Sequence, residues 1–179
     1  MNRKLNNYDL SGEYGIGYTS NDNTIFYFDL EDYDKIKDYT WRCDRGRYIL
    51  TTYSANNKTQ WVYLHKLIIN ADSDTVVDHI NRNKCDNRKH NLRCCTSQEN
   101  NFNNSKRLTN KTGIIGVCWK TDKNKWKSYI TLNGKQKHLG YFNDIEDAIK
   151  ARLKAEAKYF GVFSPQIDLF DKYGVNLNE

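Results

Sequence analysis

The chain has 179 residues, of which 38% are hydrophobic, 13% are aromatic and 28% are charged, and its formal net charge is +6. This length suits one ordinary domain or two small ones, and the composition supports a buried core but not a bundle of membrane helices. No apolar run reaches the roughly 18 residues that a spanning helix needs, and the first residues do not read as a secretion signal. We therefore expect a soluble, cytoplasmic protein with no membrane partner.

The five cysteines predict neither disulfides nor zinc. Their number is odd and no two of them have the CxxC spacing of a zinc site. We expect reduced and mostly packed thiols, and no structural zinc.

Residues 1–60 are expected to form a β-rich N-terminal scaffold. Alternating residues separated by turn and loop sequences predict strands, and an acidic stretch predicts one short helix. The predicted strands are 14–18, 25–28, 47–53 and 60–64, and the predicted helix lies within 29–39. This part of the chain holds no residues that suggest chemistry.

The central segment predicts two strands and a helix. Residues 76–80 and 91–95 read as short strands, and a polar, basic loop of residues 81–90 separates them. Thr96 and Glu99 have the spacing of a capping box, which predicts a helix that presents Asn100 near its start.

Three residues of this segment have the chemistry of a phosphodiester-cleaving site. The carboxylate of Asp78 and the amide oxygen of Asn100 are hard ligands that suit Mg²⁺ or Mn²⁺. His79 follows Asp78 directly and could accept a proton from water. An isolated Asp-His pair is more often an ordinary strand end, so this interpretation depends on the surrounding motif.

The surrounding sequence supplies that motif. Asp78-His79, Asn91 and Asn100, with the flanking stretches 63–68, 77–88 and 91–93, resemble the HNH endonuclease family, in the variant that ends in Asn and occurs in phage and intron-encoded homing endonucleases. The resemblance covers residues 61–104.

The resemblance implies a ββα-metal fold in which Asp78 and Asn100 hold one divalent cation, Mg²⁺ or Mn²⁺. His79 would be the general base, and Asn91 would brace the loop and orient the histidine. Basic side chains of the same module are expected to contact DNA: Arg82, Lys84, Arg88 and Arg93. We expect His65 to be a packing residue and His90 to face solvent.

A basic linker, residues 105–112, precedes a second module over residues 113–163, and residues 164–179 read as a tail. The module predicts three antiparallel strands, with a hairpin turn at Asn133-Gly134, followed by a helix. Its stretches 113–117, 125–126, 137–142 and 155–161 resemble an AP2 DNA-binding domain.

One face of this second sheet is expected to bind duplex DNA. In the middle strand, apolar residues alternate with basic ones, so the apolar row should pack on the helix and the basic row should face outward. A solvated lysine face is the simpler alternative. The residues expected to contact DNA are Lys120, Lys125, Lys127, Tyr129, Lys137 and His138.

These observations together predict an α+β protein that is a metal-dependent DNA endonuclease of phage or bacterial origin, acting at a preferred site. A homodimer would allow both strands to be cut. Two alternatives stay open: a non-catalytic DNA-binding regulator that retains the nuclease frame, and a nuclease of defence or degradation that cuts without sequence preference.

Overall fold

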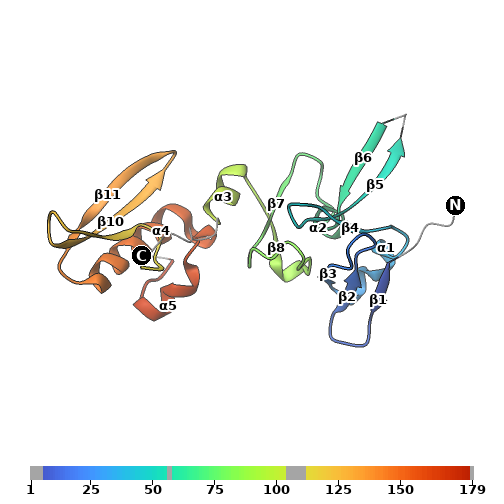
Figure 1. The fold of residues 1–179 in the computed structure, drawn as a ribbon, viewed down its shortest axis with the longest axis horizontal. Coiled ribbons are helices and arrows are strands. Elements are labelled where there is room, and N and C mark those ends of the chain that lie inside the picture. Colours follow the sequence, from blue (N-terminus) through green and yellow to red (C-terminus); the bar gives the residue numbers. More distant parts are fainter. Residues whose placement is uncertain (1–5, 56–57, 104–111, 178–179) are drawn as a thin grey trace. The chain divides into compact units, whose positions relative to one another are not determined.

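The structure, a computed structural model, describes residues 6–55, 58–103 and 112–177. The chain divides into two compact units, Met1–Ser97 and Gln98–Glu179, which are described separately. Both contain small antiparallel sheets and helices, so the expected α+β class is confirmed (Figure 1). Within the described ranges, every helix is too short or too polar to cross a bilayer.

The first unit begins with a three-stranded antiparallel sheet in the order β1-β2-β3. Its strands are β1 (Asn7–Asp9), β2 (Gly15–Tyr18) and β3 (Ile25–Phe28). β2 carries two glycines because a Cβ at Gly15 or Gly17 would lie within 2.3 Å of an atom of the Phe28 or Phe26 ring. Both rings are fully buried, and the strands predicted at 14–18 and 25–28 are confirmed as an antiparallel pair.

A second antiparallel sheet, in the order β4-β5-β6, follows a short helical stretch. The helical elements are the 3₁₀ turn η1 (Leu30–Asp32) and α1 (Tyr33–Ile36). The strands are β4 (Arg42–Cys43), β5 (Ile49–Ala55) and β6 (Lys58–Tyr63), and α2 (Leu64–Ile68) continues directly from β6. The two longer strands correspond to those predicted at 47–53 and 60–64.

The predicted ββα segment has the expected element types. β7 (Val76–His79) pairs antiparallel with β8 (Leu92–Cys95), the 3₁₀ turn η2 (Lys89–Asn91) ends the loop between them, and α3 (Ser97–Phe102) follows. By its contacts, the greater part of α3 is assigned to the second unit.

Residues 6–60 and the β7–β8 segment share one hydrophobic core. Phe26, Trp41 and Ile49 of the N-terminal part pack in the same cluster as Leu64 and Val77. Burial of such side chains contributes about 1.5–3 kcal/mol each. The predicted boundary at residue 60 therefore falls inside β6 and inside a single compact unit.

The second unit contains the predicted sheet and helix. β9 (Val117–Lys120), β10 (Lys125–Leu132) and β11 (Lys135–Phe142) form an antiparallel sheet in the order β11-β10-β9. α4 (Ile145–Phe160) packs against it through a buried face that includes Ile149 and Leu153. The side chain of Asp144 caps the helix by accepting a hydrogen bond from the Glu146 amide.

The C-terminal segment differs from the predicted tail. Residues 161–173 form the 3₁₀ turns η3 (Gly161–Phe163) and η4 (Ile167–Leu169) and the helix α5 (Phe170–Tyr173). Phe170 and Val175 belong to the core of the second unit. The predicted linker at 105–112 lies outside the described residues except for Thr112.

Candidate active site

Asp78 and His79 end the strand β7, and both are almost completely buried. The register of β7 with β8 places Asp78 opposite Arg93 and His79 opposite Leu92. Because neighbouring residues of a strand point to opposite faces, the two side chains enter different surroundings.

The carboxylate of Asp78 forms an ion pair with Arg93. The Oδ2 atom of Asp78 accepts hydrogen bonds from Nε of Arg93 at 2.9 Å and from its second guanidinium nitrogen at 2.6 Å. A buried carboxylate needs such a partner, because an isolated charge is strongly disfavoured away from water. Arg93, predicted to contact DNA, therefore has a structural partner.

His79 contacts the loop that joins β7 to β8. Its Nε2 lies 3.3 Å from Oδ1 of Asn87, a fully buried side chain. An amide oxygen can only accept, so this contact places the imidazole proton on Nε2 and the lone pair on Nδ1. Burial lowers the pKa of His79, although the contact with Asn87 acts in the opposite direction. The neutral form that a general base requires is therefore favoured.

Asn91 fixes the two ends of this loop. Its Oδ1 accepts a hydrogen bond from the Asn81 amide at 2.8 Å, and its Nδ2 donates to the Asp86 carbonyl at 2.8 Å. The backbone of Asn91 also accepts from the Ile80 amide. Asn91 is buried and so connects both sides of the loop that carries Asn87.

Asp86 holds the middle of the loop in place. Its two carboxylate oxygens accept hydrogen bonds from Arg88, each at 2.8 Å, and Oδ2 also accepts from Asn81. Burial would raise the pKa of Asp86, but Arg88 and Asn81 together hold it below its ordinary value. Backbone hydrogen bonds with Tyr27 attach the same stretch to β3. Arg88, predicted to contact DNA, is engaged in this network.

Aromatic rings from outside the loop surround the imidazole of His79. The ring of His65 meets it edge to face, with 5.1 Å between centroids, and the ring of Tyr48 lies 6.2 Å away. Tyr63 lies against both Tyr48 and His65. The sequence indicated a packing role for His65 and offered no local signal that it would lie against His79.

The second predicted metal ligand, Asn100, is half-buried on α3 and belongs to the second unit. The structure therefore brings together Asp78, His79 and Asn91, while the pairing of Asp78 with Asn100 stays a prediction. In the described part of the chain, no group of three or more His, Cys, Asp or Glu side chains is arranged to hold a metal.

The donor types fit a hard divalent cation, since a carboxylate and an amide oxygen suit Mg²⁺ or Mn²⁺. Because Oδ2 of Asp78 already accepts from Arg93, a cation at Asp78 would share this carboxylate with the guanidinium.

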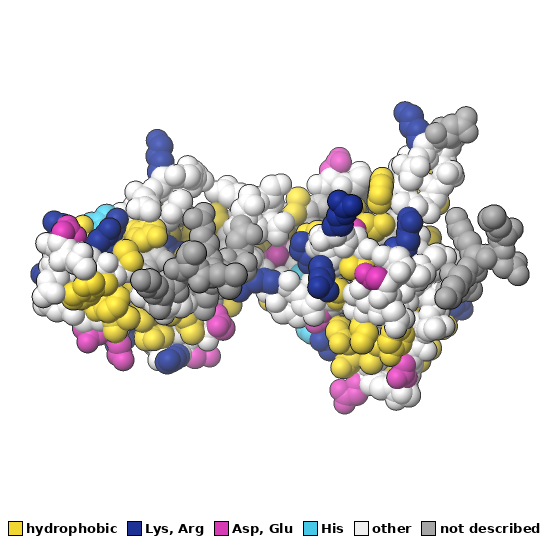
Figure 2. Space-filling view, in the orientation of Figure 1, with side chains coloured by type: hydrophobic (Ala, Val, Ile, Leu, Met, Phe, Trp, Pro, Cys, Tyr) yellow, Lys and Arg dark blue, Asp and Glu magenta, His cyan; other side chains and the backbone are white. Residues whose placement is uncertain are grey.

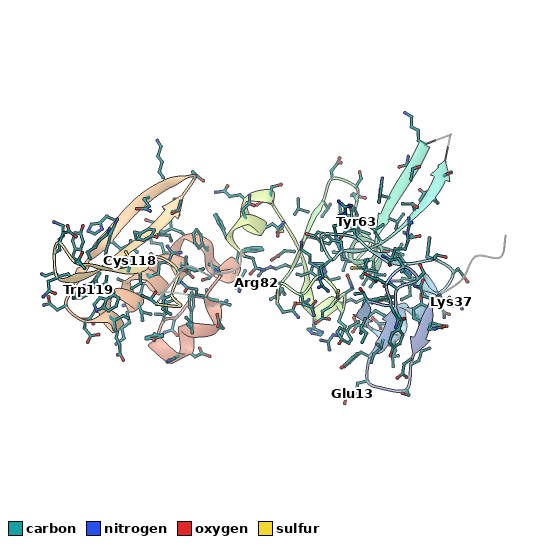
Figure 3. All side chains as sticks on the ribbon, in the orientation of Figure 1. Glu13, Lys37, Tyr63, Arg82, Cys118 and Trp119 are labelled. Carbon is teal, nitrogen blue, oxygen red and sulfur yellow. The ribbon has the colours of Figure 1, made fainter. Side chains whose placement is uncertain are left out.

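Two other basic residues predicted to contact DNA lie on the loop. Arg82 is exposed, with a left-handed backbone (φ 64°), and Figure 3 labels its side chain. Lys84 donates from Nζ to the Gly46 carbonyl at 3.0 Å and lies over the Tyr48 ring at 4.1 Å.

In the second unit, the residues predicted to contact DNA divide between two faces of the sheet. Lys125, Lys127 and Tyr129 alternate on β10, and their cross-strand partners include Lys120 and His138. These five residues therefore lie on the face opposite to the buried Ser128 and Ile130.

Lys137 is placed differently. It pairs with the buried Ile130 across the strands and donates from Nζ to the Tyr159 hydroxyl of α4 at 2.6 Å. A bulge in the register between Ser128 and Tyr129 changes which side chains of β11 share a face with β10. Lys137 thus lies on the helix side of the sheet, separate from the other five residues.

Comparison with known proteins gives matches to a nuclease family model and to viral proteins. A family model described as HNH endonuclease matches residues 70–102. An HNH endonuclease of Acanthamoeba polyphaga mimivirus is 28% identical over 143 residues, which cover 79% of this chain and 73% of the relative. Protein 3.8 of Escherichia phage T7 is 32% identical over 88 residues, which cover 49% of this chain and 72% of the relative. No solved structure gives a significant match.

Proposed function

This chain belongs to the HNH endonuclease family of phosphodiester hydrolases, and we propose that it is a metal-dependent DNA endonuclease that cuts at a preferred site, as homing endonucleases do. The observation that carries the proposal is the buried His79 imidazole, held by Asn87 at Nε2 with its neutral form favoured by burial. A neutral histidine is the form that can accept a proton from the water that attacks a phosphodiester.

In this proposal, His79 accepts a proton from the attacking water at Nδ1. Asn91 acts indirectly, because it fixes the ends of the loop that carries Asn87. Asp78 and Asn100 would hold one Mg²⁺ or Mn²⁺ ion, which would stabilise the negative charge that develops on the phosphate. Arg93 orients the Asp78 carboxylate through two hydrogen bonds to Oδ2.

The second unit would bind the duplex through the outward face of its sheet, as an AP2-like domain. This face carries Lys120, Lys125, Lys127, Tyr129 and His138. A small antiparallel sheet fits the major groove of B-DNA, and lysines supply affinity for phosphates more than base discrimination. A preference for one site would then come from the few aromatic and imidazole groups on the same face.

Plasmid nicking tests this proposal. Purified protein with Mg²⁺ should convert supercoiled plasmid to the open circular form, and His79→Ala should abolish this conversion. His90→Ala is the matched control, because His90 is an exposed histidine of the same loop. The proposal fails if both variants behave like the wild type. Mapping the cut ends on long DNA then separates a preferred site from indifferent cleavage, and the mass of the protein–DNA complex reports whether a homodimer forms.

One observation favours a second candidate, a non-catalytic DNA-binding protein. The Asp78 carboxylate is already paired with Arg93, and such pairing could replace metal binding rather than accompany it. In that case the wild type would shift DNA in a gel with or without Mg²⁺ and leave the plasmid uncut.

A further inference from the structure

The turn between β4 and β5, residues 44–48, lies beside the loop that joins β7 to β8, the nuclease loop, although the two are distant in sequence. Lys84 of the loop donates to the Gly46 carbonyl at 3.0 Å, and the Cys85 thiol contacts the Arg47 carbonyl at 3.7 Å. Tyr48, the last residue of the turn, contributes its ring to the surroundings of His79. The turn therefore borders the candidate active site.

This turn presents positive charge to solvent. Arg45 and Arg47 are both exposed, whereas the carboxylate of Asp44 accepts a hydrogen bond from the Tyr48 amide at 2.7 Å within the turn. Hydrogen bonds from Thr19 and Thr24 lower the pKa of the nearby Asp22 carboxylate, and the charge of Arg47 lowers it by a smaller amount. Figure 2 shows several Lys and Arg side chains gathered on one face of the first unit.

The backbone at Arg47 is in the left-handed region, with φ 66°. Glycine or asparagine adopts this conformation at lower cost than arginine does. Residues with a strained backbone of this kind concentrate at functional sites, where the function of the side chain outweighs the cost of the conformation. The side chain of Arg47 is exposed, so packing in the core does not explain its presence.

We propose that Arg45 and Arg47, together with Lys84, form a basic rim that binds backbone phosphates of the DNA next to the bond that is cut. Guanidinium groups suit this role because their planar fork binds two phosphate oxygens at once. Lys84, on the loop that joins β7 to β8, contacts Gly46 and the Tyr48 ring of the turn. Because the Tyr48 ring lies near His79, the rim lies near the candidate catalytic residue. This inference rests on the proposed function and extends the nuclease site into residues 44–48, outside the 70–102 match.

The test uses the double variant Arg45→Gln, Arg47→Asn, which removes both charges and places at position 47 a residue that tolerates the left-handed backbone. A matched control, Lys37→Gln with Lys58→Gln, removes two charges from the same unit. Figure 3 labels Lys37 well away from Arg82 of the nuclease loop.

Binding of duplex DNA is measured by fluorescence anisotropy without divalent metal at several salt concentrations. The plot of log affinity against log salt concentration should become shallower by about 1.8 in the rim variant, since each lost phosphate contact contributes about 0.9. The control should keep the wild-type slope, and the melting temperature of the rim variant should equal or exceed that of the wild type.

Location is tested with a duplex whose phosphates flanking the mapped cut are replaced by uncharged methylphosphonates. The wild type should bind this duplex more weakly than the unmodified duplex. The rim variant should bind the two duplexes with equal affinity. Equal slopes for the rim variant and the control, or equal sensitivity of the wild type and rim variant to methylphosphonates, would overturn the inference while leaving cleavage intact. Wild-type protein that neither binds nor cuts DNA would instead overturn the proposed function.

Discussion

The imidazole rings of His65 and His79 meet edge to face inside the first unit, with 5.1 Å between their centroids. His65 lies on α2 and is 5% exposed, and its Nδ1 has no hydrogen-bond partner among the described groups. An unpaired buried polar group costs about 1–3 kcal/mol. His65 on α2 therefore contacts the candidate catalytic residue, and its unpaired Nδ1 has a measurable cost in stability.

Replacing His65 should impair cleavage by removing the ring that supports His79. We expect His65→Leu to lower kcat about tenfold to a hundredfold, because small displacements of a catalytic group have effects of this size. His65→Phe keeps a ring at the position and should retain more of the rate. Multiple-turnover nicking at saturating DNA measures kcat separately from KM. Tyr53→Leu, an exposed position on β5, is the control, and a His65→Leu protein that cuts as fast as this control would contradict the prediction.

Acidification should destabilise the protein through His65. Burial lowers the pKa of folded His65 to about 3, whereas a histidine in an unfolded chain titrates near 6.5. Below about pH 6.5 the unfolded state binds the proton and the folded state does not, so stability falls as the pH falls. The loss is about 1.4 kcal/mol per pH unit and continues toward pH 3.

This pH effect is measured as a difference between two proteins. Urea unfolding of the wild type and of His65→Phe between pH 7 and pH 4 cancels the contributions of carboxylates common to both. The stability advantage of His65→Phe should grow as the pH falls. A difference that does not change with pH would contradict the prediction, because it would show that the pKa of His65 is the same in the folded and unfolded states.

The strands and helices were largely predictable because their signals are local. The Asn133-Gly134 turn fixes the β10–β11 hairpin, and alternation along β10 predicts which residues are buried. The contact of His65 on α2 with His79 on β7 depends on the tertiary fold, and no pattern within either segment encodes it. The ion pair between Arg93 and Asp78 could not be predicted from the sequence either, because it depends on the register of β7 with β8.

Arg93 should be needed for stability as well as for any function. Arg93→Ala would leave the buried Asp78 carboxylate without its partner, which costs about 3–5 kcal/mol for pairs of this kind. A double variant with Asp78→Asn should recover much of the loss, since the amide has no charge to compensate. Thermal or urea unfolding measures both effects. If Arg93 serves only to contact DNA, Arg93→Ala will unfold like the wild type and bind DNA more weakly.

The C-terminal segment should be essential to the second unit. Glu156 of α4 is fully buried and accepts hydrogen bonds from Arg152 at 2.8 Å, from Gln166 at 2.7 Å and from the Ser164 hydroxyl. Gln166 in turn accepts from the Ile115 amide, so one network joins the helix, the segment before β9 and the C-terminal residues.

Deletion of residues 164–179 would remove two of the partners of Glu156 together with Phe170 and Val175 of the core. We expect the amides of β10 to lose their protection from hydrogen exchange, while those of β5 in the first unit keep theirs. Glu156→Ala should cost about 3 kcal/mol or more, because it leaves the buried Arg152 unpaired. Lys172→Ala, an exposed position on α5, is the control and should leave exchange unchanged. Full protection of β10 in the shortened chain would mean that these residues form a tail after all.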